Sequence, residues 1–156
     1  MLRGWRVDLS RYRPKIFLSR AERHRSNDEA CGEHFTGIGM QAIAEAVALG
    51  EKAGLDRHRL LDVLSQTAVV APAHVGKLQR AMKSDYSPQF PIRLMNKDFG
   101  LILDLASTVG ARMPATGAAF DINARQLDEG AEQDFSAVIL QMEKRAHLGS
   151  NGNGRT

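Results

Sequence analysis

The sequence is poor in cysteine, with Cys31 as its single thiol. One thiol cannot form an intrachain disulfide, and a low cysteine content is typical of a reducing compartment. The sequence also lacks any apolar run near the roughly 20 residues that a membrane-spanning helix needs. The histidines show no metal-ligand spacing, so each is expected at the surface: His24, His34, His58, His74 and His147. We therefore expect no disulfide framework, no membrane span and no metal centre.

Aromatic residues make up only 6% of the chain, and alternating apolar and polar runs are short. Both features argue against β-strands, while alanine and leucine dominate the patterned segments. With 43% hydrophobic residues, a chain of 156 residues can bury one core of ordinary size. We therefore predict an all-α fold, a single bundle of about six helices around a long central helix.

Positive charge is concentrated at the start of the chain. Residues 1–25 hold eight of the 21 Lys and Arg residues but only two acidic residues, so this segment carries +6 and the remainder −3. We divide the chain into a basic leader over residues 1–33, a helical domain over 34–148 and a disordered tail over 149–156. Pro14 and the lack of sustained apolar periodicity predict a poorly ordered leader without a packed role. Its arginine-rich composition is also typical of an organelle transit peptide, and electrostatic contact with nucleic acid or anionic lipid is a weaker alternative.

Six helices are predicted from apolar spacing and from the residues at their ends. They cover residues 34–53, 57–67, 71–84 and 90–106, a segment from Pro114 to Gly130, and residues 135–147. Asp56 and Asp134 are the predicted N-caps, and Gly54 and Gly110 are predicted terminators. In the first and central helix, the small residues Ala42, Ala44 and Ala46 are expected to let neighbouring helices approach closely.

The segment FPIRLMNKDFGLILDLA, residues 90–106, combines charge with apolar residues in an unusual way. On a helix of about 3.6 residues per turn, one face carries Leu94, Asp98, Ile102, Leu105 and Val109. That face places the Asp98 carboxylate within an apolar stripe, where it needs a hydrogen-bonding partner. Lys97 shares a neighbouring face with Arg93 and Asp104, and the simplest interpretation is a solvated amine in a surface charge network.

Four segments, taken together and in order, carry a family resemblance. They are AIAEAVALGEKAGLD at residues 42–56, LMNKDFGLILDLA at 94–106, MPATGAAF at 113–120 and QDFSAVILQMEK at 133–144. Their order and spacing resemble the C-terminal helical domain of the β-hydroxyacid dehydrogenases. That family includes 3-hydroxyisobutyrate dehydrogenase and is related to the 6-phosphogluconate dehydrogenases. The resemblance implies an all-α bundle like the C-terminal domain of 6-phosphogluconate dehydrogenase.

The resemblance also implies where a site lies. In the family, the lysine of the Lys-Asp pair borders the cleft between two domains, near the nicotinamide and the substrate. This assigns a cofactor-binding role to Lys97, with Asp98 as its structural neighbour. The aromatic residue at the position of Phe90 tends to lie near the same cleft, although an ordinary core side chain is the stronger interpretation. The implied cofactor is NAD or NADP, and the implied substrate is a small hydroxyacid.

Two further family features do not match. The Gly-x-Gly at Gly37 follows no predicted strand and lacks a third glycine, so it is not a dinucleotide fingerprint, and we expect no Rossmann domain in this chain. Counting back from Ala44 places the family's catalytic lysine at Glu29 and its two asparagines at Gly32 and Glu33. The general acid/base is therefore missing, and we predict no catalytic residue.

These observations favour one function and leave one alternative. We predict the substrate and dimerisation domain of an NAD(P)-dependent 3-hydroxyisobutyrate dehydrogenase-like oxidoreductase that is inactive on its own. The alternative is a non-catalytic helical oligomerisation or interaction module. The expected partners are a second copy of the chain, because the family's central helix packs against a partner subunit, and a separate Rossmann-domain chain. The expected location is the cytoplasm, with organelle targeting through the leader as the alternative.

Overall fold

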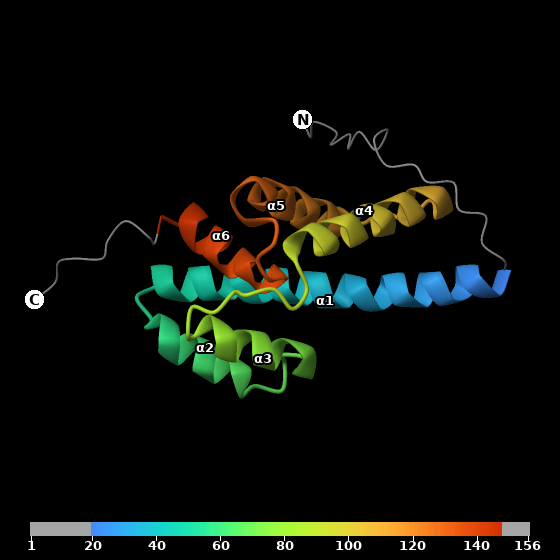
Figure 1. Cartoon of the computed structure of the whole chain (residues 1–156). Coiled ribbons are helices and arrows are strands. Elements are labelled where there is room, and N and C mark those ends of the chain that lie inside the picture. The colour runs from blue at the N-terminus through green and yellow to red at the C-terminus, as the bar shows by residue number, and fades with distance from the viewer. Residues whose placement is uncertain (1–19, 148–156) are drawn as a thin grey trace, which may run out of the picture.

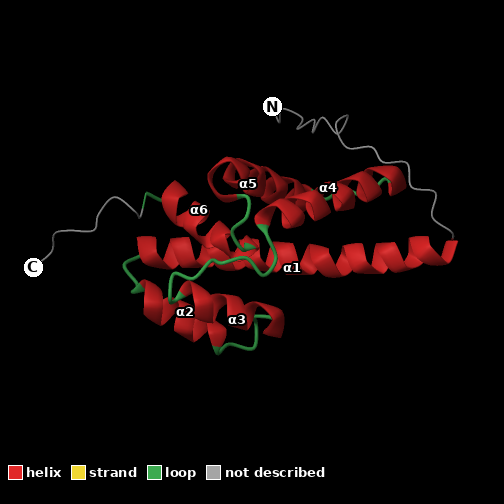
Figure 2. Ribbon diagram, in the orientation of Figure 1, coloured by secondary structure: helices red, strands yellow, loops and turns green. Residues whose placement is uncertain are grey.

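The computed structural model describes the backbone of residues 20–147 and the side chains of residue 28 and residues 30–147. Residues 1–19 of the predicted leader and the whole predicted tail lie outside this range. The elements are α1 (Arg20–Lys52), α2 (Arg57–Ser65), α3 (Pro72–Ala81), α4 (Ile92–Val109), α5 (Pro114–Gly130), the short 3-10 helix η1 (Phe135–Ala137) and α6 (Val138–Arg145). Within the described range no segment is a strand (Figure 2), so the all-α prediction is confirmed.

The long helix α1 is the centre of the bundle (Figure 1). Helices α2 and α3 pack against each other on one side of it, and α4, α5 and α6 lie on the other side. Helix α4 follows the N-terminal part of α1, while α6 lies beside its C-terminal part. The predicted arrangement of six helices around a long central helix is therefore confirmed. No helix in the described range is long and apolar enough to cross a membrane.

Local residue chemistry sets several helix ends as predicted. Asp56 accepts a hydrogen bond of 2.8 Å from a main-chain N–H in the first turn of α2, and Asp134 caps η1 in the same way. Gly54 after α1 and Gly110 after α4 have φ values of 90° and 74°. Glycine adopts such positive values without steric cost, and each glycine ends its helix.

The start of α1 differs from the prediction. We predicted a helix from residue 34, whereas α1 begins at Arg20. Residues 20–33, which we assigned to the leader, are rich in Arg, Ala and Glu, and these residues have high helix propensity. They lack the apolar periodicity on which the prediction relied. Periodicity therefore located the packed part of the helix and missed its polar N-terminal extension.

The buried face of α4 is also not the predicted one. The predicted stripe ran through Leu94, Asp98, Ile102, Leu105 and Val109. The buried residues are instead Ile92, Met95, Asn96, Phe99, Ile102 and Ala106. Asp98 is half-buried and Val109 is 68% exposed. Because the large ring of Phe99 is completely buried, it fixes the rotation of α4 about its own axis and turns Val109 outward.

Two glycines allow α1 to approach its neighbours. A Cβ atom at Gly37 would lie 2.4 Å from Cζ of Phe99 and 2.7 Å from Sδ of Met95, both on α4. A Cβ atom at Gly39 would lie 2.6 Å from Cε1 of His74 on α3. Real Cβ atoms do not sit this close to other atoms, so α1 contacts α4 and α3 through positions that have no side chain.

Two predictions about α1 and its neighbours were wrong. Ala44 is buried, but Ala42 and Ala46 are exposed, so these two do not mediate close packing within the chain. His74 is 3% exposed rather than at the surface, and its Nε2 lies 2.9 Å from the carbonyl oxygen of Thr36. This histidine can be buried because the ring occupies the space above Gly39 and its nitrogen has a hydrogen-bonding partner.

Asp134 is a buried charge, only 1% exposed, that links three parts of the chain. Its Oδ2 accepts hydrogen bonds from Lys77 Nζ at 2.5 Å, from the Phe90 N–H at 3.0 Å and from the Gln89 N–H at 3.2 Å. Its Oδ1 accepts from the N–H and the hydroxyl of Ser136. Burial alone would raise the pKa of Asp134, but the hydrogen bonds from Lys77, Ser136 and Phe90 outweigh it and hold the pKa below its ordinary value. One carboxylate thus joins α3, the loop before α4, and η1.

We expect Gly37→Ala to destabilise the fold. The new methyl group would overlap the Phe99 ring and the Met95 sulfur, and overpacking a core costs about 1–3 kcal/mol. Gly76→Ala in α3 is the matched control, since a Cβ atom there meets nothing within 4 Å and alanine favours a helix over glycine by about 1 kcal/mol. Thermal unfolding followed by circular dichroism should show a lower Tm for Gly37→Ala and no decrease in Tm for Gly76→Ala. Equal Tm values for Gly37→Ala and the unchanged chain would contradict the close contact.

We expect Asp134→Asn to destabilise the fold by about 3 kcal/mol at pH 7, because it leaves the largely buried Lys77 amine without its countercharge. For a chain of this size that loss lowers Tm by about 6–12 °C. The pKa of Asp134 is lower in the folded state than in the unfolded state, where it is about 3.9. The stabilisation is therefore fully present above the unfolded-state pKa and is lost as pH falls through the folded-state pKa. The stabilities of the two proteins should therefore converge in acid.

The matched control for Asp134→Asn is Glu129→Gln. Glu129 pairs with Lys144 at 2.6 Å, but the two side chains are 53% and 65% exposed. Removing an exposed pair costs less than about 1 kcal/mol. If both substitutions lowered Tm by the same small amount, the buried carboxylate would have no special structural role.

Candidate functional site

Lys97 lies in the second turn of α4 with its side chain exposed. Among the described side chains, its amine joins no ion pair within 4.0 Å. Arg93, one turn earlier, pairs instead with Glu132, with Nε and Oε1 2.6 Å apart. The predicted network of Arg93, Lys97 and Asp104 therefore contains no ion pair. The amine of Lys97 keeps three N–H donors directed toward solvent or a ligand.

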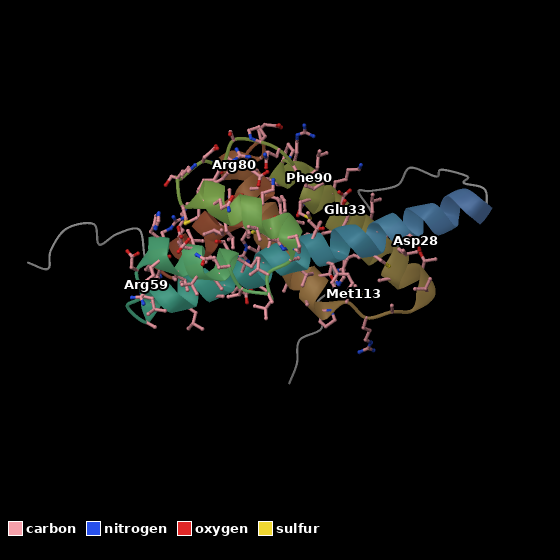
Figure 3. All side chains as sticks on the ribbon, turned by 90° about the horizontal axis from the view of Figure 1, so that it is seen from below. Asp28, Glu33, Arg59, Arg80, Phe90 and Met113 are labelled. Carbon is pink, nitrogen blue, oxygen red and sulfur yellow. The ribbon has the colours of Figure 1, made fainter. Side chains whose placement is uncertain are left out.

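Asp98 is half-buried and interacts electrostatically with Glu33 of α1. Burial raises the pKa of Asp98, and the positive charge of Lys97 opposes that effect. Burial, and then the negative charge of Asp98, raise the pKa of Glu33. Glu33 lies on α1, on the C-terminal side of Asp28 (Figure 3). The α1–α4 contact thus brings one amine and two carboxyl groups together from two helices.

Phe90 precedes α4 and packs into the core. Its ring meets the Phe135 ring edge-on, with the centroids 5.9 Å apart. Its main-chain N–H donates to Asp134. These contacts agree with the interpretation of Phe90 as a core side chain at the entrance to α4. Of the three predicted cofactor-binding residues, Lys97 and Asp98 are adjacent on one helix, whereas Phe90 is held by a different set of contacts.

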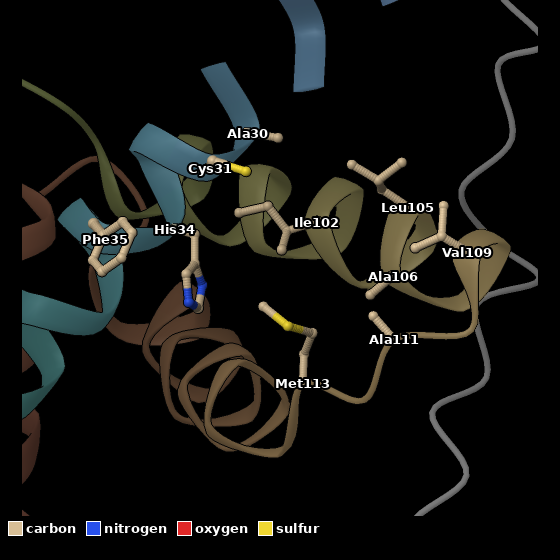
Figure 4. Close-up of a pocket in the computed structure, with 10 residues that line it drawn as sticks. All are labelled: Ala30, Cys31, His34, Phe35, Ile102, Leu105, Ala106, Val109, Ala111 and Met113. Carbon is tan, nitrogen blue, oxygen red and sulfur yellow. The ribbon is translucent and has the colours of Figure 1, made fainter. Parts of the chain in front are cut away.

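An apolar pocket opens between α1, the end of α4 and the segment that enters α5 (Figure 4). Its volume is about 220 Å³, and it is lined by Ala30, Cys31, His34, Phe35, Ile102, Leu105, Ala106, Val109, Ala111 and Met113. Nδ1 of His34 lies 3.2 Å from the hydroxyl of Thr116, which satisfies one ring nitrogen. The Phe35 ring is 76% exposed, so apolar surface continues outward from the pocket.

Sequence reasoning missed this pocket. Ile102, Leu105 and Val109 were predicted as part of the core face of α4, and in the structure they form one wall of an open pocket. The opposite wall comes from Cys31 and Phe35, which lie four residues apart and therefore on one side of α1. That spacing was a detectable signal, but the predicted helix began only at residue 34.

The described side chains do not form a metal site, since no three His, Cys, Asp or Glu residues among them gather around a common point. The site chemistry available in this part of the chain is therefore that of an exposed amine, two carboxyl groups with raised pKa values, and an adjacent apolar surface.

Comparison with curated proteins finds relatives among hydroxyacid dehydrogenases and related reductases. A probable 3-hydroxyisobutyrate dehydrogenase of Mycobacterium tuberculosis is 35% identical over 127 residues, which is 76% of this chain and 42% of the relative. Glyoxylate/succinic semialdehyde reductase 1 of Arabidopsis thaliana is 39% identical over 102 residues, 64% of this chain and 35% of the relative. The chain thus spans about two fifths of the length of the curated relatives it matches.

The fold is also found in a solved structure. The crystal structure of 3-hydroxyisobutyrate dehydrogenase from Salmonella typhimurium superimposes with a TM-score of 0.68 at 27% identity, covering 74% of this chain and 41% of that one. The family model described as NAD-binding of NADP-dependent 3-hydroxyisobutyrate dehydrogenase matches residues 30–142. The match begins within α1 and ends within α6. Because this match takes in most of the chain and every helix of the bundle, the chain belongs to the 3-hydroxyisobutyrate dehydrogenase family, of which it represents the C-terminal helical domain.

Proposed function

We propose that the chain acts as the substrate and dimerisation domain of an NAD(P)-dependent 3-hydroxyisobutyrate dehydrogenase-like oxidoreductase. The observation that carries the proposal is the family match over residues 30–142, within which α4 presents the Lys-Asp pair of the family at an accessible position. The substrate is a small hydroxyacid by the same reasoning. The proposed location is the cytoplasm, because a single cysteine is typical of proteins in a reducing compartment.

The proposed contacts to NAD or NADP are made by Lys97, with Asp98 beside it. An exposed amine fits the polar edge of a nicotinamide nucleotide, to which it can donate hydrogen bonds. Phe90 fits less well, because its half-buried ring is already packed against Phe135. When bound, the nicotinamide supplies the hydride chemistry, and the protein supplies binding and orientation. Lys97 is therefore the residue whose removal should weaken cofactor contact.

The 156-residue chain alone is expected to lack dehydrogenase activity. By the family spacing, the position of the general acid/base falls at Glu29, and the asparagine positions fall at Gly32 and Glu33. A lysine can donate a proton to the substrate hydroxyl oxygen or accept one, and it also attracts a substrate carboxylate, whereas a glutamate at its position repels that carboxylate. The chain thus has a cofactor-side contact without the matching acid/base group.

Calorimetry and activity assays test this proposal together. The purified chain should not turn over 3-hydroxyisobutyrate with either NAD or NADP, and should bind one of these nucleotides weakly. Lys97→Ala should weaken binding about tenfold, the effect of losing one hydrogen bond to a charged group. Lys83→Ala, which removes another exposed lysine, is the control and should not change binding. Turnover at rates typical of the family, or equal binding by the unchanged chain and Lys97→Ala, would contradict the proposal.

We also propose that two copies of the chain associate through α1. An apolar stripe on this helix is exposed, with Phe35 and Leu49 at 76% and 73% exposure and with Ala42 and Ala46 between them. Residues 35, 42 and 49 are seven positions apart, a spacing that places them on one side of a helix. Exposed apolar stripes of this kind are typical of subunit contacts, and a twofold dimer buries the same stripe of both copies.

Light scattering after size-exclusion chromatography tests the dimer. The expected mass is about twice the 17.1 kDa of one chain, since the stripe supports one twofold contact. Leu49→Ser should shift the equilibrium toward the monomer. Val69→Ser, which changes an even more exposed apolar residue outside α1, should not. A monomer at all concentrations would refute the association.

The alternative function is a non-catalytic helical interaction module. Such a module would also form the dimer, but Lys97 would have no cofactor-binding role in it. It is favoured by the exposed apolar stripe and by the departure of Glu29, Gly32 and Glu33 from the family pattern. A module of this kind would bind neither nucleotide and would not respond to Lys97→Ala. A separate Rossmann-domain chain is the proposed partner under the first function only.

A further inference from the structure

A cluster of ionisable side chains joins four parts of the chain at the C-terminal end of α1. Arg57, at the start of α2, donates from Nε to Oε1 of Glu143 in α6 at 2.6 Å. The same guanidinium donates to the Tyr86 hydroxyl at 2.9 Å and to the carbonyl oxygen of Ala81 at 3.1 Å. Glu51, in the last turn of α1, completes the cluster. Figure 1 shows this end of α1 lying between α6 and α2.

Glu51 lacks a hydrogen-bond donor in this cluster. Its Oε2 is buried, and no donor among the described residues reaches it. The carboxylate of Glu143 lies within hydrogen-bonding reach of Glu51, is only 13% exposed and already accepts a bond from Arg57. Two ionised carboxylates cannot satisfy each other, because both only accept hydrogen bonds. With one proton between the two carboxyl groups, one of them can donate a hydrogen bond to the other.

We propose that Glu51 and Glu143 share one proton at and below neutral pH, and that this proton is a pH-operated latch that fastens α2 to α1 and α6. With the proton in place, Glu51 donates to Glu143, and Glu143 accepts from Arg57. The three helices are then connected by a continuous chain of hydrogen bonds. Without it, two negative charges face each other beside the one guanidinium, and the contact between α1 and α6 that orients Arg57 is weakened.

The other groups that face Glu51 do not change charge in the relevant pH range. Burial, and then the Glu143 carboxylate, raise the pKa of Glu51 to about 7; Arg57 lowers it and Asp56 raises it. Burial raises the pKa of the Tyr86 phenol, so it stays protonated between pH 5 and 8. The bonds to Glu143 and Tyr86 raise the pKa of Arg57 despite its burial, so it stays charged. Glu51 is therefore the group of the cluster that titrates in this range.

The direction of the effect follows from the raised pKa. In the unfolded chain a glutamate has a pKa of about 4.3, whereas Glu51 in the fold keeps its proton until about pH 7. A group that binds a proton more tightly in the folded state stabilises the fold in acid, and that stabilisation is lost as pH rises through this window. The latch is therefore closed in mild acid and opens toward pH 8.

Hydrogen exchange of α2 amides tests the latch. Glu51→Gln replaces the protonated acid with an amide that can donate to Glu143 at every pH. We expect the α2 protection factors of this variant and the unchanged chain to be most similar at pH 5, the lower end of the range tested. Above pH 5 the protection of the unchanged chain should fall below that of the variant by up to tenfold per pH unit until about pH 7. Glu45→Gln, an exposed glutamate on the same helix, is the control and should follow the unchanged chain.

Two results would overturn the proposal. One is a constant ratio of α2 protection between Glu51→Gln and the unchanged chain from pH 5 to pH 8. The other needs no variant: carboxyl carbon NMR of the unchanged chain should show Glu51 titrating with a midpoint near 7, and a midpoint near the ordinary 4.5 would exclude the shared proton. Neither outcome depends on nucleotide binding or dimerisation, so the latch stands or fails independently of the proposed function.

Discussion

The buried carboxylate of Asp134 is the interaction on which the placement of the helices depends. A charge that is 1% exposed is tolerable only with donors on both oxygens, and the structure supplies five of them from Lys77, Gln89, Phe90 and Ser136. Main-chain bonds reinforce the arrangement: the Asp134 N–H donates to Tyr86, and the Phe135 N–H donates to Phe90, both at 2.9 Å. The loop before α4 and the loop before α6 are therefore held side by side.

This junction has a consequence for the candidate site. Helix α4 begins directly after the segment that Asp134 holds, so its entry point is fixed relative to α3 and η1. The rotation of α4 is fixed separately, by Phe99 packing against Gly37 of α1. One contact sets where the helix starts and the other sets which face turns outward. Lys97 is exposed, and Asp98 is half-buried, because of both.

The sequence was sufficient to predict features that depend on neighbouring residues. Asp56, Gly54 and Gly110 mark helix ends through their own hydrogen bonds or backbone angles, and these need no knowledge of the rest of the fold. The fold class follows for a similar reason, because helical spacing is a property of short segments. The Lys-Asp pair was found by resemblance rather than by pattern, since an exposed lysine has no distinctive pattern.

The features that were missed depend on contacts between distant segments. Two adjacent stripes of α4 are apolar enough to be buried, and the choice between them is made by Gly37, more than 50 positions away. His74 is buried because Gly39 leaves room for its ring. Glu33 was noted only as a mismatch to the family, and its interaction with Asp98 follows from the α1–α4 contact. Periodicity along one segment cannot reveal such pairings.

The length of α1 explains why the bundle leaves part of its apolar surface uncovered. A helix of 33 residues is about 50 Å long, whereas α4, with 18 residues, is about 27 Å long, and α6, with eight, is about 12 Å. The shorter helices therefore cannot cover every side of α1 along its whole length. From residue 35 onward, most of the exposed residues of α1 are apolar, namely Phe35, Ala42, Ala46 and Leu49, with Glu45 and Lys52 as the charged ones. Burying an apolar side chain away from water is favourable, so this side of α1 is where we propose that a second copy of the chain binds.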